Sequence, residues 1–391
     1  MINPSPSLPY LLDTAIEAFQ TIYDRPPQWQ GVAPGRVNLI GDHTDYNDGW
    51  VLPMAIDRYT VAVAAERQSD AMLHLYSMAL GEEASLPLEQ LGQPHPQQWV
   101  RYVQGVVIEY HRLGVRCPAL DLLIASSVPA GGGLSSSAAL EMAVAYLLEM
   151  ITGVQIPSYD RIQACVRAER QMAGVPCGVM DQTVVDVAEA GHALALDCAN
   201  HVVTPVSVSL DQVSLLVAHS GVSHALAEDA YAQRRQECEQ AAERLGVSTL
   251  RELDLDDIDR LADDALLLRR VRHVVTENAR VQQAVTAMRR GDWANFGVLM
   301  TESHASLRDN YEVSCDELNQ LVELASAEPG VLGARMTGGG FGGSAIILVE
   351  SPRLEDVAIS LCSAYLQETG YTPACFQVRA TAGAREINAR T

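Results

Sequence analysis

The sequence predicts an α+β protein of two domains, in which mixed sheets pack with helices. Its 391 residues are many for a single hydrophobic core. Apolar residues make up 48% of the chain and charged residues 19%, which is the balance of a globular protein and not of a disordered one. Apolar runs with strand spacing alternate with helical patterns along both halves, so we expect both element types in each domain.

In the first half, apolar spacing near 3.6 residues predicts helices, and short continuous or alternating apolar runs predict strands. The expected helices are Leu11–Tyr23, Trp99–Leu113, Ser136–Ile151 and Tyr159–Met172. The expected strands are Arg36–Ile40, Val51–Ile56, Thr60–Ala65, Leu73–Ser77, Leu120–Ala125 and Ala193–Asp197. An alternating run, Val202–Val208, ends this half, so we predict one domain at 1–207 and a second at 208–391.

The second half is richer in helical patterns. The expected helices are Leu226–Leu245, Leu266–Arg290, Asp292–Asp309, Cys315–Ala327 and Leu354–Glu368. The expected strands are Ser214–His219, Ser344–Val349 and Ala374–Val378. Strands separated by helices favour an α+β layer in this half too.

All 27 basic residues are arginine, and the formal net charge is −22. Basic residues form no block, so we expect no nucleic-acid partner. The absence of lysine excludes the GxxxxGK[ST] phosphate loop, a lysine Schiff base and the strand lysine of protein kinases. A phosphate site in this chain therefore depends on backbone N–H groups, Mg²⁺ or a few placed arginines.

The eight cysteines are scattered without a CxxC pair, which argues against a zinc site and a disulfide scaffold. The first residues lack a basic segment followed by an apolar one, and no uncharged apolar run approaches about 18 residues. We therefore expect a cytoplasmic protein with reduced thiols and no membrane partner. We also expect a monomer, although no feature of the sequence determines the oligomeric state.

The segment VPAGGGLSSSAALEMAVAYLLE, Val128–Glu149, contains a glycine-serine run. Consecutive glycines adopt positive φ angles and let the backbone approach a ligand. The serines begin a helix, whose free N–H groups attract anions. This pattern predicts a loop that binds a triphosphate, with the Ser137 hydroxyl available to Mg²⁺. The alternative is a flexible turn before an N-capped helix.

The segment APGRVNLIGDHTDYNDGWVLP, Ala33–Pro53, gathers Arg36, Asp42, His43 and Asp45 around a strand and its turn. The two aspartates and the histidine can accept hydrogen bonds from several hydroxyls, as recognition of a polyol requires. The alternatives are half of a metal site or a solvated turn.

Two further segments carry similar signals. ARMTGGGFGGSAIILV, which starts at Ala334, is a second glycine-rich loop before an apolar strand, and it either wraps phosphates or makes a tight connection. In GVPCGVMDQTVVD, Asp181 follows Gly178 after a proline turn. A carboxylate in such a place orients or deprotonates a hydroxyl, unless it is only a helix N-cap.

These four segments together resemble the GHMP kinases, and the glycine-serine run is similar to the signature of their galactokinase branch. The segments WVRYVQGV, AYAQRRQEC, VRHVVTENAR and ESHASLRDNYEVS are similar to that branch as well. The resemblance implies a two-domain GHMP kinase fold with the active site in the cleft between the domains. It also implies transfer of the ATP γ-phosphate to the anomeric hydroxyl of D-galactose, which gives galactose 1-phosphate and ADP.

The resemblance assigns roles position by position, with ATP and Mg²⁺ as cofactors. The catalytic positions are Asp181 and Arg36. The sugar-binding positions are Arg36, Asp42, His43, Asp45, Gly178, Asp181 and Tyr231. The nucleotide-binding positions are Trp99, Gly131, Gly132, Gly133, Leu134, Ser135, Ser136 and Ser137. The metal positions are Ser137 and Glu169.

One position departs from the family pattern, because galactokinases usually have glutamate where this chain has Asp42. With a shorter side chain, the site is either roomier at the sugar hydroxyl that this residue contacts or holds a water that bridges the gap. Arabinose, a uronic acid and N-acetylgalactosamine therefore stay open as substrates. A non-catalytic galactose sensor is a further alternative, which the complete Ser137-Ala138-Ala139 sequence disfavours. Whether Asp181 acts as a base or positions the hydroxyl also stays open.

Overall fold

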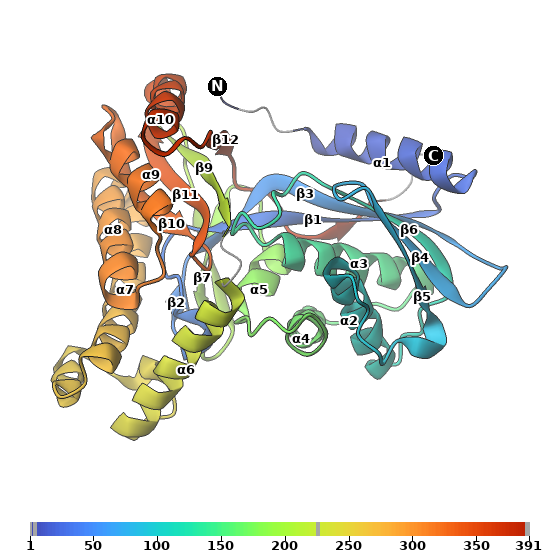
Figure 1. Ribbon diagram of the computed structural model, residues 1–391, viewed down its shortest axis with the longest axis horizontal. Coiled ribbons are helices and arrows are strands. Elements are labelled where there is room, and N and C mark those ends of the chain that lie inside the picture. Colours follow the sequence, from blue (N-terminus) through green and yellow to red (C-terminus); the bar gives the residue numbers. More distant parts are fainter. Residues whose placement is uncertain (1, 3–5, 224–226, 388–391) are drawn as a thin grey trace.

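The computed structural model describes residue 2, residues 6–223 and residues 227–387, and Figure 1 shows two main sheets side by side with helices around them. The α-helices are α1 (Leu8–Tyr23), α2 (Gln98–Arg112), α3 (Ser136–Thr152), α4 (Ser158–Ala168), α5 (Met180–Val187), α6 (Ala227–Leu245), α7 (Ala265–Arg290), α8 (Trp293–Ser306), α9 (Asp316–Ala327) and α10 (Leu354–Thr369). The strands are β1 (Trp29–Asn38), β2 (Trp50–Val51), β3 (Pro53–Glu66), β4 (Met72–Ser77), β5 (Glu82–Pro87), β6 (Leu120–Ser126), β7 (His192–Asp197), β8 (Val202–Ser207), β9 (Val213–Ser223), β10 (Val331–Thr337), β11 (Gly342–Glu350), β12 (Ala374–Val378) and β13 (Arg385–Glu386).

The six-stranded sheet has the order β13-β1-β3-β6-β4-β5, and only β4 and β6 pair in parallel. β1 and β3 are buried on both faces, because α1 covers one face of the sheet and α3 the other. A Cβ atom on Gly31 would lie 2.3 Å from the Ala143 carbonyl oxygen, so glycine here lets α3 rest directly on β1. The loop before α3 consequently meets the end of β1, where the Arg36 N–H donates to the Leu134 carbonyl at 3.0 Å.

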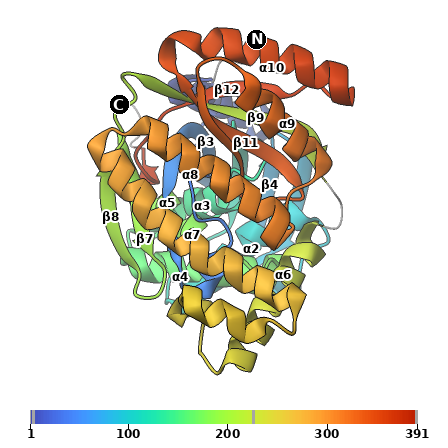
Figure 2. The ribbon, with the colours of Figure 1, turned by 90° about the vertical axis from the view of Figure 1, so that its left-hand side faces the viewer.

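The four-stranded sheet has the order β10-β11-β9-β12 and is antiparallel throughout. Helices α8 and α9 pack on β10, and Figure 2 shows α7 and α8 side by side across this part of the molecule. A Cβ atom on Gly333 of β10 would lie 2.1 Å from the Gly297 carbonyl oxygen of α8, so this packing also depends on glycine. Among the described residues, no helix is long and apolar enough to cross a membrane.

The predicted α+β class is confirmed, but three of the predicted strands differ from the structure. The strand expected to start at Arg36 begins earlier, at Trp29. The prediction missed its first half because the glycines and the proline there are residues typical of loops. The strands expected at 51–56 and 60–65 are largely one strand, β3. The polar residues Asp57 and Arg58 between them form a bulge, where the pairing partner jumps from Tyr59 to Ile56.

Three strands were not predicted. Half of the residues of β5 are exposed, β10 precedes a glycine run, and β13 has two residues, so none has a clear apolar pattern. Two predicted helices end in π-helical turns, at Glu169–Ala173 after α4 and at Leu307–Tyr311 after α8. Such turns are frequent at functional sites. The expected first residue of α6, Leu226, lies outside the described residues.

The division into domains at 1–207 and 208–391 stays a prediction. It falls between β8, the last strand of a small β2-β7-β8 sheet, and β9 of the four-stranded sheet. The chain then returns to the first sheet, because β13 pairs with β1 through Gly31 and Glu386. The end of the second predicted domain therefore completes the sheet of the first.

Candidate active site

A cavity of about 820 Å³ lies where β1, α3 and α5 meet the loop between β10 and β11. This volume is in the range of sites for small molecules. The predicted site residues that line it are Arg36, Asp42, His43, Asp45, Trp99, Gly131, Gly133, Leu134, Ser135, Ser136, Ser137, Glu169, Gly178, Asp181 and Tyr231. Gly132 is not among the lining residues. A Cβ atom there would lie 3.1 Å from the His219 ring.

The glycine-serine run forms the turn into α3. Gly131 and Gly133 have φ angles of 68° and 70°, which glycine adopts easily, and Ser135 follows with 57°. Helix α3 begins at Ser136, so its first N–H groups have no acceptor within the helix. These groups and the helix dipole favour an anion in front of the helix. The predicted helix start is confirmed, and its anion-binding role stays a prediction.

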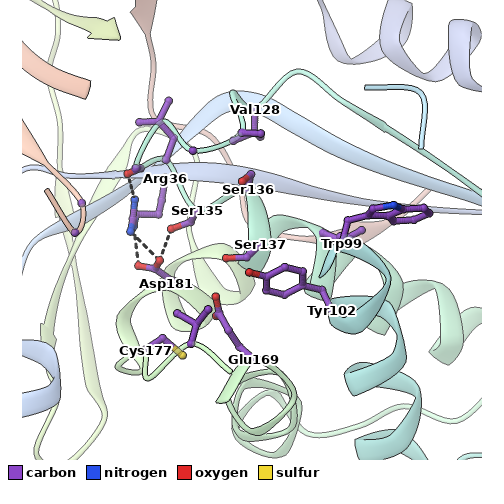
Figure 3. Close-up of a pocket in the computed structure, with 18 of the residues that line it drawn as sticks. Arg36, Trp99, Tyr102, Val128, Ser135, Ser136, Ser137, Glu169, Cys177 and Asp181 are labelled. Atoms are coloured by element: carbon purple, nitrogen blue, oxygen red, sulfur yellow. Dashed lines mark hydrogen bonds and ion pairs between the residues drawn. The ribbon is translucent and has the colours of Figure 1, made fainter. Parts of the chain in front are cut away.

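Arg36 and Asp181 form a two-pronged ion pair in the cavity (Figure 3). Arg36 Nε donates to Asp181 Oδ1 at 2.8 Å, and Nη2 donates to Oδ2 at 2.7 Å. The remaining terminal nitrogen, Nη1, donates to the Gly133 carbonyl at 2.6 Å. The Ser135 hydroxyl donates to Asp181 Oδ2 as well, a contact that the sequence did not predict. Three hydrogen bonds thus orient a carboxylate that still keeps 23% of its side chain exposed.

Asp45, Gly178 and Tyr231 lie together in the cavity lining. A Cβ atom on Gly178 would lie 1.7 Å from Asp45 Oδ2, so glycine leaves the space that this carboxylate occupies. Burial, and then the charge of Asp181, raise the pKa of Asp45 to about 6. Burial raises the pKa of Tyr231 well above its ordinary value, so its phenol keeps its proton. A carboxylate, a phenol and a closely approaching backbone can bind the hydroxyls of a small polyol.

Asp42 and His43 line the cavity but are bonded to the second glycine-rich loop. Asp42 Oδ2 pairs with Arg335, and Oδ1 accepts the Gly338 N–H at 2.9 Å. His43 Nε2 lies 3.2 Å from the Gly339 carbonyl oxygen. Sugar contacts were predicted for both residues, and Arg335 was not predicted as their partner. Arg335 could have been noticed in the sequence, because a charged residue inside an apolar segment is seldom buried without a partner.

Ser137 and Glu169 both line the cavity and lie near each other, as Figure 3 shows. Gln182 Nε2 donates to Glu169 Oε2 at 2.5 Å. Burial, and then the charge of Asp181, raise the pKa of Glu169. Within the described part of the chain, no group of three or more His, Cys, Asp or Glu side chains could hold a metal ion. A hydroxyl and one carboxylate still fit Mg²⁺, which commonly takes its other oxygen ligands from phosphates and water.

Two aromatic residues of α2, Trp99 and Tyr102, line the part of the cavity away from Asp181 (Figure 3). The Trp99 indole N–H donates to Glu82 Oε2 at 2.9 Å, which fixes the ring in a partly exposed position. Tyr102 was not predicted. Its spacing of three residues from Trp99 places both on one face of the helix, and that was a usable signal. Flat, apolar rings here suit the base of a nucleotide.

Models of known families match three segments of the chain. The galactokinase galactose-binding signature matches residues 17–66, which include the cluster from Arg36 to Asp45. The N-terminal domain of GHMP kinases matches residues 101–188, with the phosphate loop and Asp181. The C-terminal domain of GHMP kinases matches residues 284–366, with the second glycine-rich loop.

Similar proteins and structures agree with these matches. The galactokinase of Homo sapiens is 44% identical over 88% of this chain and 90% of its own length. That of Streptomyces coelicolor is 40% identical over 96% of this chain and 98% of its own length. The structure of Lactococcus lactis galactokinase complexed with galactose superposes with a TM-score of 0.91, at 32% identity over 96% of this chain and all of the other. Methanococcus jannaschii mevalonate kinase, 16% identical with a TM-score of 0.65 over 91% of this chain and 99% of its own, shares the fold alone. The chain has the GHMP kinase fold and belongs to the galactokinase family.

Proposed function

We propose that the chain is an ATP-dependent kinase that transfers the γ-phosphate of ATP to the anomeric hydroxyl of D-galactose, giving galactose 1-phosphate and ADP. One arrangement carries this proposal: the Arg36–Asp181 ion pair lies in a single cavity with the start of α3 and with Asp45. The start of α3 suits the phosphates of ATP, and Asp45 suits the hydroxyls of a sugar. The ion pair is therefore where a phosphate and a sugar hydroxyl would meet.

Each member of the ion pair has a distinct role in the proposed reaction. Of the five N–H donors of a guanidinium, Arg36 uses three on Asp181 and Gly133. The other two are free to bind oxygens of the transferring phosphoryl group, whose charge they stabilise. Asp181 accepts a hydrogen bond from the anomeric hydroxyl and orients its oxygen toward phosphorus. The bond between the γ-phosphorus and the bridging oxygen of ADP breaks as the new oxygen–phosphorus bond forms, and the hydroxyl proton passes along its hydrogen bond to the Asp181 carboxylate and from there to solvent.

Mg²⁺ would bind at Ser137 and Glu169 and neutralise charge on the ATP phosphates. Glu169→Gln is expected to raise the Mg²⁺ concentration for half-maximal rate by about tenfold or more, because an amide lacks the carboxylate charge. The rate is measured against Mg²⁺ concentration at saturating ATP and galactose. Affinity for ATP without metal, measured by calorimetry, is the control and should not fall, because the amide removes a negative charge near the phosphates. An unaltered Mg²⁺ requirement would remove Glu169 from the metal site.

The KM for galactose is expected to rise as the pH falls through about 6. Asp45, whose pKa is raised to about 6, takes up a proton there, and a protonated carboxyl loses acceptor capacity for sugar hydroxyls. Burial lowers the pKa of His43 to about 3, so its ring stays neutral over this range. KM is measured between about pH 5 and pH 8. Asp45→Asn should flatten the profile, and a profile that keeps its inflection in this variant assigns it to another group.

An assay for ADP release, run with a panel of sugars, tests the proposed function against its alternatives. The proposal expects release with galactose and slower release with arabinose, galacturonic acid and N-acetylgalactosamine. A galactose sensor would bind the sugar and release no ADP, and a higher kcat/KM for another sugar would reassign the substrate. Cytoplasmic location and a monomeric state stay predictions.

A further inference from the structure

The carboxylate of Asp42 is enclosed by protein on both of its oxygens. Oδ2 is paired with Arg335, and Oδ1 accepts the backbone N–H of Gly338 at 2.9 Å. The side chain of Asp42 is 2% exposed and that of Arg335 is fully buried. A buried ion pair of this kind fixes both partners strongly, because separating them would leave an uncompensated charge.

The next residue, His43, contacts the next residue of the same loop, Gly339. Its Nε2 lies 3.2 Å from the Gly339 carbonyl oxygen, which only accepts, so Nε2 carries the proton. Its Nδ1 then accepts from the Tyr46 hydroxyl at 2.8 Å. Burial lowers the pKa of this ring to about 3, which agrees with a neutral imidazole. Two successive side chains therefore hold two successive backbone groups of the second glycine-rich loop.

This loop lies against the phosphate loop. A Cβ atom on Gly338 would lie 2.7 Å from the Gly133 carbonyl oxygen, and one on Gly133 would lie 2.8 Å from the Thr337 carbonyl oxygen. The same Gly133 carbonyl accepts Arg36 Nη1 at 2.6 Å. A continuous set of contacts thus runs from Asp42 through the second glycine-rich loop to the phosphate loop and Arg36.

We propose that Asp42 is a positioning residue, which docks the second glycine-rich loop (residues 337–341) onto the phosphate loop, and that it does not read a sugar hydroxyl directly. This inference rests on the proposed function and deepens it, because it moves hydroxyl recognition to Asp45 and its neighbours. The length of aspartate suits this role, since one carboxylate reaches Arg335 and the Gly338 N–H together. Loss of its charge should loosen Gly133 and so weaken nucleotide binding.

A cycle of enzyme variants and substrate variants tests the inference. We would measure kcat/KM for the wild type and Asp42→Asn with galactose and with its 2-, 3-, 4- and 6-deoxy derivatives. The expected result is a loss of about tenfold that is the same, within about twofold, for every sugar. Asp45→Asn is the matched comparison, and its loss should shrink on at least one deoxy sugar. If the loss in Asp42→Asn disappears on one deoxy sugar, Asp42 reads that hydroxyl and the inference is wrong.

Binding of a non-hydrolysable ATP analogue without sugar gives a second readout. In Asp42→Asn, the Kd for the ATP analogue, measured by calorimetry, is expected to be about tenfold higher than in the wild type. An unchanged Kd contradicts the proposal that Asp42 docks the loop. Asp42→Glu, which keeps the charge and adds a methylene, replaces the Asn variant if thermal melting shows that variant to be unfolded. The Kd is again expected to rise, because the longer side chain displaces the carboxylate from Arg335 and from the Gly338 N–H. A wild type that binds the analogue but does not phosphorylate galactose would end the proposed function, while the Kd comparison would still decide the inference.

Discussion

Asp181→Asn is expected to lower kcat for galactose by about 10³-fold. The amide keeps the size of the side chain but loses the charge that pairs with Arg36 and the acceptor that orients the sugar hydroxyl. Binding of ATP should weaken much less, because the phosphate loop contributes its own backbone groups. Initial rates of ADP release at saturating substrates measure the effect.

Asp186→Asn is the matched control for this variant. Asp186 lies five residues further along the chain on α5, where it pairs with Arg161 at 2.8 Å, and it does not line the cavity. Its substitution should lower thermal stability and leave kcat per folded molecule within about threefold. If Asp181→Asn keeps kcat within tenfold of the wild type, the carboxylate has no part in the chemical step.

Gly178→Ala is expected to lower kcat/KM for galactose by about 10²-fold or more. The added methyl carbon would lie 1.7 Å from Asp45 Oδ2, so the carboxylate or the turn at residues 175–178 must move by more than an ångström. Displacement on this scale costs about 10²-fold when a group positions the substrate. Kd for galactose, measured by calorimetry, and kcat/KM report the change.

A control and a second ligand separate this effect from general damage. A Cβ atom on Gly92 would meet nothing within 4 Å, so Gly92→Ala should behave as the wild type. Affinity of Gly178→Ala for an ATP analogue should fall by less than about threefold, because the atoms nearest to the added methyl carbon all belong to Asp45. Equal losses of affinity for galactose and for the ATP analogue would indicate that the turn has collapsed. An unchanged affinity for galactose would show that the sugar binds elsewhere.

Local features of the fold were predictable from sequence because short segments determine them. The glycine-serine run predicts a turn followed by the start of a helix, and α3 begins at Ser136 as expected. Pairings between distant segments were not predictable in this way. β13 meets β1 across more than 300 residues and has only two residues of its own, so no apolar pattern marks it. Strand β5 is an exposed edge strand and lacks such a pattern for that reason.

The same difference between local and long-range features applies to the candidate site. Its residues could be named from motifs and from the family resemblance, and all but Gly132 line one cavity. The partners within the protein could not be named, because hydrogen bonds between distant segments leave no local signal. Asp42 is bonded to Arg335, 293 residues away, and Ser135 donates to Asp181, 46 residues away. These partners change what the side chains of Asp42 and Ser135 can offer a ligand.

Identification of the product tests the central claim most directly. The protein is incubated with ATP, Mg²⁺ and D-galactose, and the products are examined by ³¹P and ¹³C NMR. The proposed function predicts one new phosphomonoester whose phosphorus couples to C1 of galactose, formed in equal amount to ADP. A phosphate on another carbon of the sugar, or ATP left intact beside bound galactose, would contradict it.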